Sequence, residues 1–416
     1  MANSPDADDH PGAPVTATIT TPGQTKVYGT NDPALPGLTL GGVVNGVNVT
    51  DWNLAVTAIN DAGNVTQTLS SLTRASGETV TAPGPTYAIT SGALNALGGS
   101  AAGNYSTSGA LSVANSPTLT ITQAPVTATI TTPGQTKVYG TNDPALPGLT
   151  LGGVVNGVNV TDWNLAVTAI NDAGNVTQTL SSLTRASGET VTAPGPTYAI
   201  TSGALNALGG SAAGNYSTSG ALSVANSPTL TITQAPVTAT ITTPGQTKVY
   251  GTNDPALPGL TLGGVVNGVN VTDWNLAVTA INDAGNVTQT LSSLTRASGE
   301  TVTAPGPTYA ITSGALNALG GSAAGNYSTS GALSVANSPT LTITQAPVTA
   351  TITTPGQTKV YGTNDPALPG LTLGGVVNGV NVTDWNLAVT AINDAGNVTQ
   401  TLSSLTRASG ETVTAP

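Results

Sequence analysis

The chain has 416 residues, carries a formal net charge of −11 and contains no cysteine. An acidic chain does not attract phosphate backbones, so nucleic-acid binding is not expected. The lack of cysteine excludes a disulfide scaffold and a thiolate metal site.

The dominant feature of the sequence is a long internal repeat, which follows a non-repeat N-terminal segment at residues 1–12. Solenoid units run to roughly 20–50 residues, so a repeat of this length predicts a whole small domain. The complete copies contain no substitutions, and the copies are block 1 (13–123), block 2 (124–234), block 3 (235–345) and the partial block 4 (346–416).

Within block 1, the pattern of apolar residues and threonines predicts strands separated by turns. The segment 91–102 is rich in Ala and Leu, but its glycines argue against a long helix. Turn residues lie between the apolar runs, Asn45-Gly46 among them. Short strands with such turns predict an all-β fold of tandem β-sandwich domains, Ig-like or related. In chain order, the predicted strands are 15–20, 24–28, 38–40, 52–59, 65–69, 86–90, 105–108, 110–113 and 118–122.

The blocks are joined without a Gly/Ser linker. The last strand of block 1 passes through Pro125 directly into the first strand of block 2. Proline fixes its own φ and favours extended backbone at the preceding residue. We therefore expect a semi-rigid, elongated rod that is monomeric. A second frame, with units 84–194, 195–305 and 306–416, fits the same repeat and leaves residues 13–83 incomplete.

Each copy carries one tryptophan, which is Trp52 in block 1. With Leu54, Val56 and Ala58 on the same predicted strand face, it is expected at the centre of the core. An exposed ring that stacks on carbohydrate is the alternative.

The charged residues of block 1 are interpreted as surface residues. Arg74 and Glu78 are close enough to pair across a loop, and a surface pair contributes only about 0–1 kcal/mol. Lys26 is expected to be a surface strand residue. The alternative is an intramolecular isopeptide bond from Lys26 to an asparagine, with Glu78 as a proton shuttle.

An enzyme is not expected, and no catalytic, cofactor-binding or metal-binding residue is predicted. The only histidine, His10, lies outside the repeats, so a Ser-His-Asp or His-metal site cannot exist in each block. A carboxylate pair would have to come from acids at turn-like positions, where solvated side chains are normal. Those acids are Asp32, Asp51, Asp61 and Glu78.

No cofactor is expected, and Ca²⁺ at the domain joints is the alternative. Calcium needs several converging oxygen ligands, and no complete loop signature is present. The candidate oxygens belong to Asp6, Asp8 and Asp9, to Asn31-Asp32 and to Asn60-Asp61.

Several motifs of block 1 resemble the YGX-type MBG repeats of large bacterial surface adhesins and filamentous haemagglutinin-like exoproteins. The first is Lys26-Val27-Tyr28-Gly29-Thr30-Asn31-Asp32-Pro33-Ala34-Leu35. Further matching segments follow in order at 44–46, 74–80, 87–90, 104–105 and 119–122. Residues 48–68 look like an insertion relative to that family. The resemblance implies an extended extracellular stalk or adhesive module, and it carries no catalytic residues.

The expected function is therefore that of stalk or spacer repeats in a bacterial cell-surface adhesin, projecting a distal binding region. The alternative is that each repeat binds a glycan or host protein and acts by avidity. Contact with a glycan, a host or an abiotic surface would use other regions of the protein. No run of roughly 20 apolar residues predicts a membrane span, and no signal peptide is visible. We expect an extracellular fragment that lacks its signal and anchor; a cytoplasmic repeat protein and an engineered concatemer are further alternatives.

Overall fold

The structure is a computed structural model. It describes residues 12–19, 23–109, 111–114, 116–131, 134–225, 227–243, 245–331, 333–336 and 338–411. In these ranges every regular element is a strand, apart from three short 3-10 turns, so the all-β prediction is confirmed. The non-repeat segment up to residue 11, with His10, lies outside the described residues.

The strands recur with the period of the sequence. Block 1 contains β1 (Ala13–Ile19), β2 (Gly23–Val27), β3 (Thr39–Gly41), β4 (Asn45–Thr50), β5 (Val56–Asn60), β6 (Leu69–Arg74), β7 (Thr86–Leu94), η1 (Ala102–Asn104), β8 (Tyr105–Thr107), β9 (Ser112–Val113) and β10 (Thr118–Thr122). Block 2 contains β11 (Ala124–Ile130), β12 (Gly134–Val138), β13 (Thr150–Gly152), β14 (Asn156–Thr161), β15 (Val167–Asn171), β16 (Leu180–Arg185), β17 (Thr197–Leu205), η2 (Ala213–Asn215), β18 (Tyr216–Thr218), β19 (Ser223–Val224) and β20 (Thr229–Thr233).

The third and fourth blocks repeat this order. Block 3 contains β21 (Ala235–Ile241), β22 (Gly245–Val249), β23 (Thr261–Gly263), β24 (Asn267–Thr272), β25 (Val278–Asn282), β26 (Leu291–Arg296), β27 (Thr308–Leu316), η3 (Ala324–Asn326), β28 (Tyr327–Thr329), β29 (Ser334–Val335) and β30 (Thr340–Thr344). The described part of block 4 contains β31 (Thr349–Ile352), β32 (Leu371–Gly374), β33 (Asn378–Thr383) and β34 (Val389–Asn393).

Block 1 forms two four-stranded sheets and a separate hairpin. One sheet has the order β3-β1-β8, with β9 also paired to β1, and the other has the order β2-β10-β7-β6. The first strands pair in parallel with the last ones, β1 with β8 and β9, and β2 with β10. The two ends of a block are thus tied together, whereas the β4–β5 hairpin pairs only within itself.

The predicted strands agree with the observed ones best where apolar residues alternate with threonine. The last strand, β10, has the predicted bounds, and β1, β2, β3, β7 and β8 are displaced by a few residues at most. Residues 20 and 110, at the ends of two predicted strands, lie outside the described ranges. The sequence missed β4, because Asn45-Gly46 was interpreted as a turn. Gly46 has a φ of 69°, and the register shifts between Asn45 and Val47, so the pair forms an irregularity inside the ladder.

The packing divides the chain into two compact units. Unit 1 comprises residues 1–135, 144–186 and 199–230, and unit 2 comprises residues 136–143, 187–198 and 231–416. The core of unit 1 joins buried residues of block 1, such as Leu72 and Tyr87, to Trp163 and Ile170 of block 2. In unit 2, Trp385 of block 4 belongs to one cluster with residues of block 3. The hairpins of blocks 2 and 4 therefore contribute to the core of the block before them.

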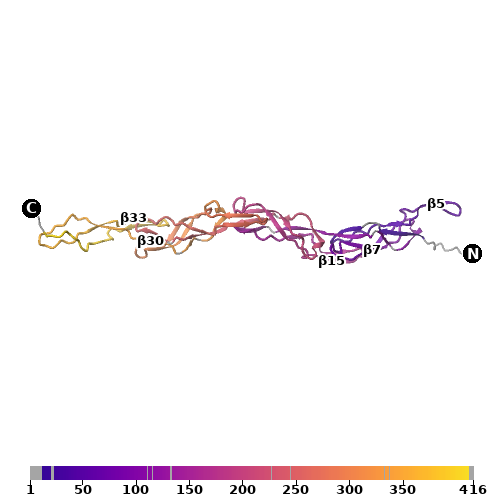
Figure 1. The fold of residues 1–416 in the computed structure, drawn as a ribbon, viewed down its shortest axis with the longest axis horizontal. Helices are drawn as coiled ribbons and strands as arrows, with labels where there is room; N and C mark the ends of the chain where they lie inside the picture. The colour runs from indigo at the N-terminus through magenta and orange to yellow at the C-terminus, as the bar shows by residue number, and fades with distance from the viewer. Residues whose placement is uncertain are drawn as a thin grey trace. The chain divides into compact units, whose positions relative to one another are not determined.

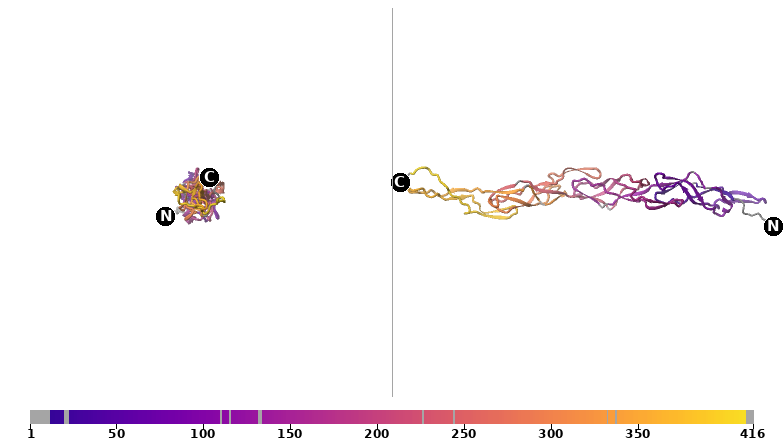
Figure 2. Two further views of the ribbon diagram at one scale, coloured as in Figure 1. Left: turned by 90° about the vertical axis from the view of Figure 1, so that its left-hand side faces the viewer. Right: turned by 90° about the horizontal axis from the view of Figure 1, so that it is seen from below.

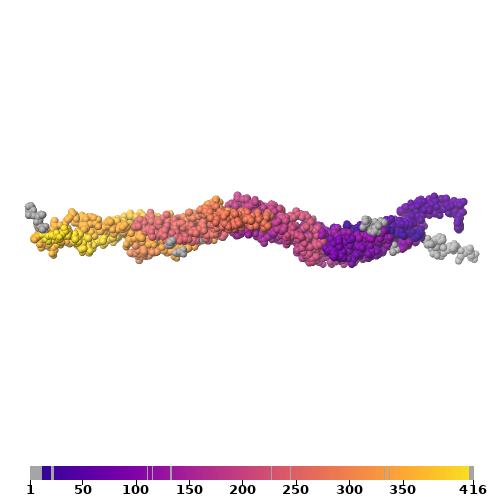
Figure 3. All heavy atoms as spheres, viewed as in Figure 1, coloured from indigo at the N-terminus to yellow at the C-terminus, as the bar shows by residue number. Residues whose placement is uncertain are grey.

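The first hairpin is the exception within unit 1. Figure 1 shows β15 of block 2 next to the part of block 1 that contains β7, while β5 stands apart. In the right-hand view of Figure 2, the purple hairpin again extends beyond the sheets of block 1. On the face shown in Figure 3, the purple hairpin projects from the block 1 sheets and no segment of another colour covers it.

Candidate functional site

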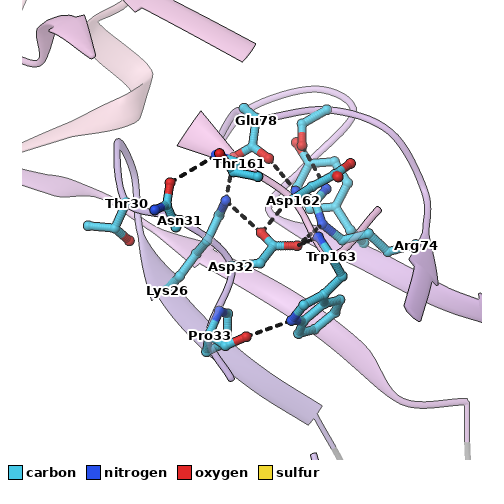
Figure 4. A network of polar contacts seen from close by, with 12 residues as sticks. Lys26, Thr30, Asn31, Asp32, Pro33, Arg74, Glu78, Thr161, Asp162 and Trp163 are labelled. Carbon is cyan, nitrogen blue, oxygen red and sulfur yellow. Dashed lines mark hydrogen bonds and ion pairs between the residues drawn. The ribbon is translucent and has the colours of Figure 1, made fainter. Parts of the chain in front are cut away.

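The most distinctive polar site is a set of four charged side chains in each block, here called the ion cluster. In block 1 it consists of Lys26, Asp32, Arg74 and Glu78 (Figure 4). Lys26 lies on β2 and Asp32 in the loop after it, while Arg74 ends β6 and Glu78 lies in the next loop. Lys26 Nζ is 2.8 Å from Asp32 Oδ1 and 2.5 Å from Glu78 Oε2. Arg74 Nε is 2.8 Å from Asp32 Oδ2, and the guanidinium also donates to Glu78.

The ion cluster is buried, which corrects the surface interpretation of Lys26 and of the Arg74–Glu78 pair. The pair exists, but the four side chains are between 1% and 7% exposed. Arg74 is also packed on Tyr87, with Cζ 5.2 Å from the ring centroid. Two cations balance two anions, so no charge is left uncompensated. Removing one member of such a buried set costs about 3–5 kcal/mol, far more than a surface pair contributes.

The ion cluster keeps Asp32 ionised. Burial by itself would raise the pKa of Asp32, but hydrogen bonds from Arg74 and Lys26 outweigh it and hold this pKa below its usual value. An ionised carboxylate accepts hydrogen bonds and donates none. Asp32 is therefore set up to receive further N–H donors.

Those donors come from the hairpin of the next block, which docks on the turn that contains Asp32. The backbone N–H of Trp163 donates to Asp32 Oδ2 at 3.2 Å, and its indole Nε1 donates to the Pro33 carbonyl at 2.6 Å. Thr161 N donates to Asn31 Oδ1 at 2.9 Å, and Asp32 N donates to the Thr161 carbonyl at 3.1 Å. Figure 4 shows the indole directed at Pro33. The joint between blocks is thus built directly on the ion cluster.

A second set of contacts completes the joint. Tyr28 of block 1 and Tyr216 of block 2 both donate to Asp172 Oδ2, at 2.8 and 2.7 Å. Their rings meet edge to face, with centroids 5.4 Å apart. Burial, followed by the hydrogen bond to Asp172, raises the pKa of Tyr28 well above its usual value. Gly29 approaches Val155 so closely that a Cβ at this position would lie 2.7 Å from Val155 Cγ2.

The same joint recurs within unit 2. Trp274 N donates to Asp143 and Trp385 N to Asp254, each at 3.2 Å. Tyr139 donates to Asp283 at 2.9 Å and Tyr250 to Asp394 at 2.8 Å. The arrangement is therefore a property of the repeated sequence.

The prediction that Trp52 is the core centrepiece of its block is wrong. Trp52 is fully exposed, while Trp163, Trp274 and Trp385 are only 7–8% exposed and are docked on the preceding block. Leu54, Val56 and Ala58 are exposed as well. Leu54 has a φ of 64° in a turn between the tryptophan and β5, which breaks the predicted strand and its common face.

The remaining acids have structural partners. Asp51 Oδ1 accepts the N–H groups of Asn53 and Ala55, both at 2.8 Å, as a turn-stabilising acid does. Asp61 accepts the hydroxyl of Tyr105 at 2.8 Å. Lys26 Nζ contacts the carboxylates of Asp32 and Glu78, so the groups around it differ from the Lys–Asn pair of the isopeptide hypothesis.

Two of the loops considered as sources of calcium ligands lie together at the joint. Asn31-Asp32 of block 1 and Asn171-Asp172, the block 2 copies of Asn60-Asp61, both lie there. Their carboxylates accept bonds from Arg, Lys, Tyr and backbone donors. Asp6, Asp8 and Asp9 lie outside the described residues. Within the described residues, no group of three or more His, Cys, Asp or Glu side chains could hold a metal ion.

Sequence reasoning missed the joint itself. From the sequence, a strand is expected at Tyr28 and at Tyr216, and Asn31 and Pro33 belong to the motif that resembles the MBG family. Nothing in the spacing of these residues shows that they contact another block. The single tryptophan of each block is the only signal that the sequence offers, and its place at the start of a predicted strand points to the core of its own block.

No helix in the described part of the chain is both long and apolar enough to cross a membrane. No protein-family model matches the chain, and no curated protein matches it.

Proposed function

We propose that the chain is a structural stalk segment, whose blocks are locked to one another to project a distal binding region of a bacterial surface adhesin. The observation that carries this proposal is the joint, which occurs in the same geometry between blocks 1 and 2, 2 and 3, and 3 and 4. At each joint a buried tryptophan of one block is bonded to a buried carboxylate of the preceding one.

The chemistry of the joint suits a connection that resists bending. An apolar contact alone is not directional, whereas hydrogen bonds fix the angle at which the hairpin meets the turn. Each such bond contributes about 0.5–1.5 kcal/mol, and those to charged groups contribute more. Asp32 serves both the ion cluster and the hairpin, so opening the joint takes a hydrogen-bond donor away from a carboxylate of the ion cluster.

The adhesin context and the extracellular location rest on the resemblance to MBG repeats and on the low content of charged residues, which make up 6% of the chain. An antibody against the blocks tests the location. We expect it to label intact bacterial cells that produce the protein. Labelling only after lysis would contradict an extracellular stalk.

Small-angle scattering tests the stalk itself, at a concentration where the chain is monomeric. We expect the extended, stiff profile of a rod for the full chain. The triple variant Trp163→Ala, Trp274→Ala and Trp385→Ala should show a shorter maximum dimension, because its joints bend. Trp52→Ala is the matched control and should scatter like the unmodified chain. A compact profile for the unmodified chain would refute the proposal.

A second candidate function, binding by avidity, is favoured by one repeated feature. Leu54, Leu165, Leu276 and Leu387 are each about 80% exposed and have φ values of 64–65°. A bulky residue in this conformation is strained, and such strain is often found at binding sites. A host-protein screen with the chain and with a variant carrying all four leucines as alanine tests this function. Retention that depends on the leucines supports it, and no retention of the unmodified chain opposes it.

A further inference from the structure

The first and last segments of a block run side by side in the same direction. In block 3, which has a block on either side, β21 pairs in parallel with β28 and then with β29, and β22 pairs in parallel with β30. The register advances steadily, from Ala235 opposite Tyr327 to Val249 opposite Thr344. Block 1 repeats this register, with β1 on β8 and β9 and with β2 on β10. The point where the chain enters a block and the point where it leaves therefore lie at opposite ends of the paired segments.

Tension along the chain reaches a block through these two segments. Thr122 ends β10 and Ala124 begins β11, and Thr233 and Ala235 are related in the same way, so one residue separates the last strand of a block from the first strand of the next. A pull on the chain draws β21 and the following β22 towards the preceding block, and it draws β30 towards the next block. Because β22 and β30 are parallel, this pull slides the two strands past each other along their length.

Sliding loads all the hydrogen bonds of the β22–β30 ladder at once. The ladder joins five residue pairs, and the bonds of a parallel ladder are evenly spaced. Two more bonds extend it, because Tyr250 N donates to the Thr344 carbonyl at 2.8 Å and Thr344 Oγ1 donates to the Lys248 carbonyl at 3.1 Å. Bonds that are loaded together must break together, whereas a pull that separates the strands from one end breaks them one after another.

The ladder is shielded on the side of the core. β30 lies between β22 and β27 in the sheet, and its Leu341 and Ile343 are fully buried. Water therefore cannot replace the hydrogen bonds of the ladder from this side while the core stays packed. Block 1 has the same arrangement, with Leu119 and Ile121 buried on β10.

The ion cluster fixes the strand that would slide. β22 is an edge strand, and its Lys248 Nζ lies 2.7 Å from Asp254 Oδ1 and 2.5 Å from Glu300 Oε2. Glu300 follows β26, which is the opposite edge of the same sheet. Figure 4 shows the copy of this contact in block 1, between Lys26 and Glu78. Sliding β22 along β30 must therefore also pull a buried ammonium group away from its carboxylates.

We propose that the block is a mechanical clamp, in which its paired first and last segments resist a pull applied along the chain. The inference rests on the proposed stalk function and deepens it, because a stalk that holds a distal binding region is pulled through its two ends. The joints keep the blocks in line, and the clamp keeps each block folded while it is pulled.

Single-molecule force spectroscopy on the full chain tests the clamp by changing only the direction of pull. The chain has no cysteine, so introduced cysteines define the points of attachment. Thr243→Cys with Gln345→Cys holds β22 at its N-terminal end and β30 at its C-terminal end, so the ladder slides. Thr243→Cys with Ser338→Cys holds both strands at their N-terminal ends, so the ladder opens from one end. The three residues are exposed, and equal urea midpoints of the two variants and the unmodified chain show that both variants are folded.

We expect the sliding geometry to need at least about twice the rupture force of the opening geometry, because five residue pairs share the load in the first and one carries it in the second. Equal forces, or a lower force on sliding, would overturn the proposal. The stalk proposal would survive that result, since it depends on the scattering profile of the chain. A compact profile with an unchanged force ratio would instead refute the stalk and leave the clamp.

A second comparison in the sliding geometry tests the ion cluster. Lys248→Met removes the contact from β22 to Glu300. Leu294→Ala is the matched control, because it removes a fully buried side chain from β26, outside the ladder. We expect the rupture force to fall by a larger fraction for Lys248→Met, since only this change acts on the strand that slides. An equal or larger fall for Leu294→Ala would overturn the role proposed for Lys248.

Discussion

Hairpins β4–β5 and β14–β15 have the same sequence and backbone but opposite surroundings. The turn residues Leu54 and Leu165 both have a φ of 64°, and the strand registers correspond. Trp52 is nevertheless fully exposed and Trp163 is buried against block 1. The hairpin's shape is thus set locally, whereas its burial is supplied by the preceding block. Block 4 gives the reverse case, an ion cluster with its pairs formed but its side chains exposed.

The largest effect is expected where a charge is removed from a buried ion cluster. Asp32→Ala leaves Lys26 and Arg74 buried with only Glu78 to balance them, and it removes the acceptor for Trp163. We expect unit 1 to lose about 3–5 kcal/mol in its free energy of unfolding, measured by urea titration with circular dichroism. The control, Asp365→Ala in the exposed cluster of block 4, should leave the unfolding curve unchanged. Equal effects of the two substitutions would show that burial of the ion cluster is unimportant.

The second comparison concerns the tryptophans themselves. Trp163→Ala removes a buried ring and the bond to Pro33, and we expect a loss of about 3 kcal/mol in the stability of unit 1. Trp52→Ala removes a ring that contacts solvent, so at low concentration its urea midpoint should match that of the unmodified chain. A destabilised Trp52→Ala monomer would mean that the first hairpin packs on its own block.

A smaller effect is expected from a pair of glycines with the same backbone conformation. Gly29 and Gly362 have φ values of 85° and 84°, so alanine is strained equally at both positions. Only at Gly29 would the new Cβ also meet Val155. We expect Gly29→Ala to lower stability by about 1–3 kcal/mol more than Gly362→Ala, because the joint must shift to make room. The difference between their urea midpoints isolates the steric contribution of the joint.

Much of the fold could be predicted from the sequence, because strand signals are local. Val15, Ala17 and Ile19 alternate with polar residues and are buried as expected, and Leu119 and Ile121 do the same in β10. Where a bulge interrupts the alternation, as at Asn45, the prediction failed.

The candidate site could not be predicted in the same way, because its contacts join residues far apart in sequence. Asp32 follows β2 and contacts Arg74 on β6, and two other strands separate β2 from β6 in the sheet. Asp32 also contacts Trp163, which belongs to the next block. An Asp-Pro pair is typical of a turn or loop, and Asp32 lies in a loop, so nothing local distinguishes it. The acids were expected to be solvated because turns usually are. Here the hairpin of the next block docks on the loop, Tyr87 packs on Arg74, and the ion cluster is buried.

Alkaline pH provides the last test, because the pKa of the tyrosine hydroxyl differs between the joints. Burial, followed by the bond to Asp394, raises the pKa of Tyr250 to about 12, and the pKa of Tyr28 is raised further by burial and Asp172. A tyrosine whose pKa is higher in the folded than in the unfolded chain contributes to stability. This contribution is complete below about pH 10, and it is lost as the pH rises through the pKa of the folded state. We therefore expect stability to fall above about pH 10, with the contribution of Tyr250 exhausted near pH 12. Urea midpoints of Tyr250→Phe and Tyr28→Phe should decline less steeply with pH than that of the unmodified chain. Parallel declines would mean that these hydroxyls do not hold the joints, and the joints would then rest on the tryptophans and ion clusters alone.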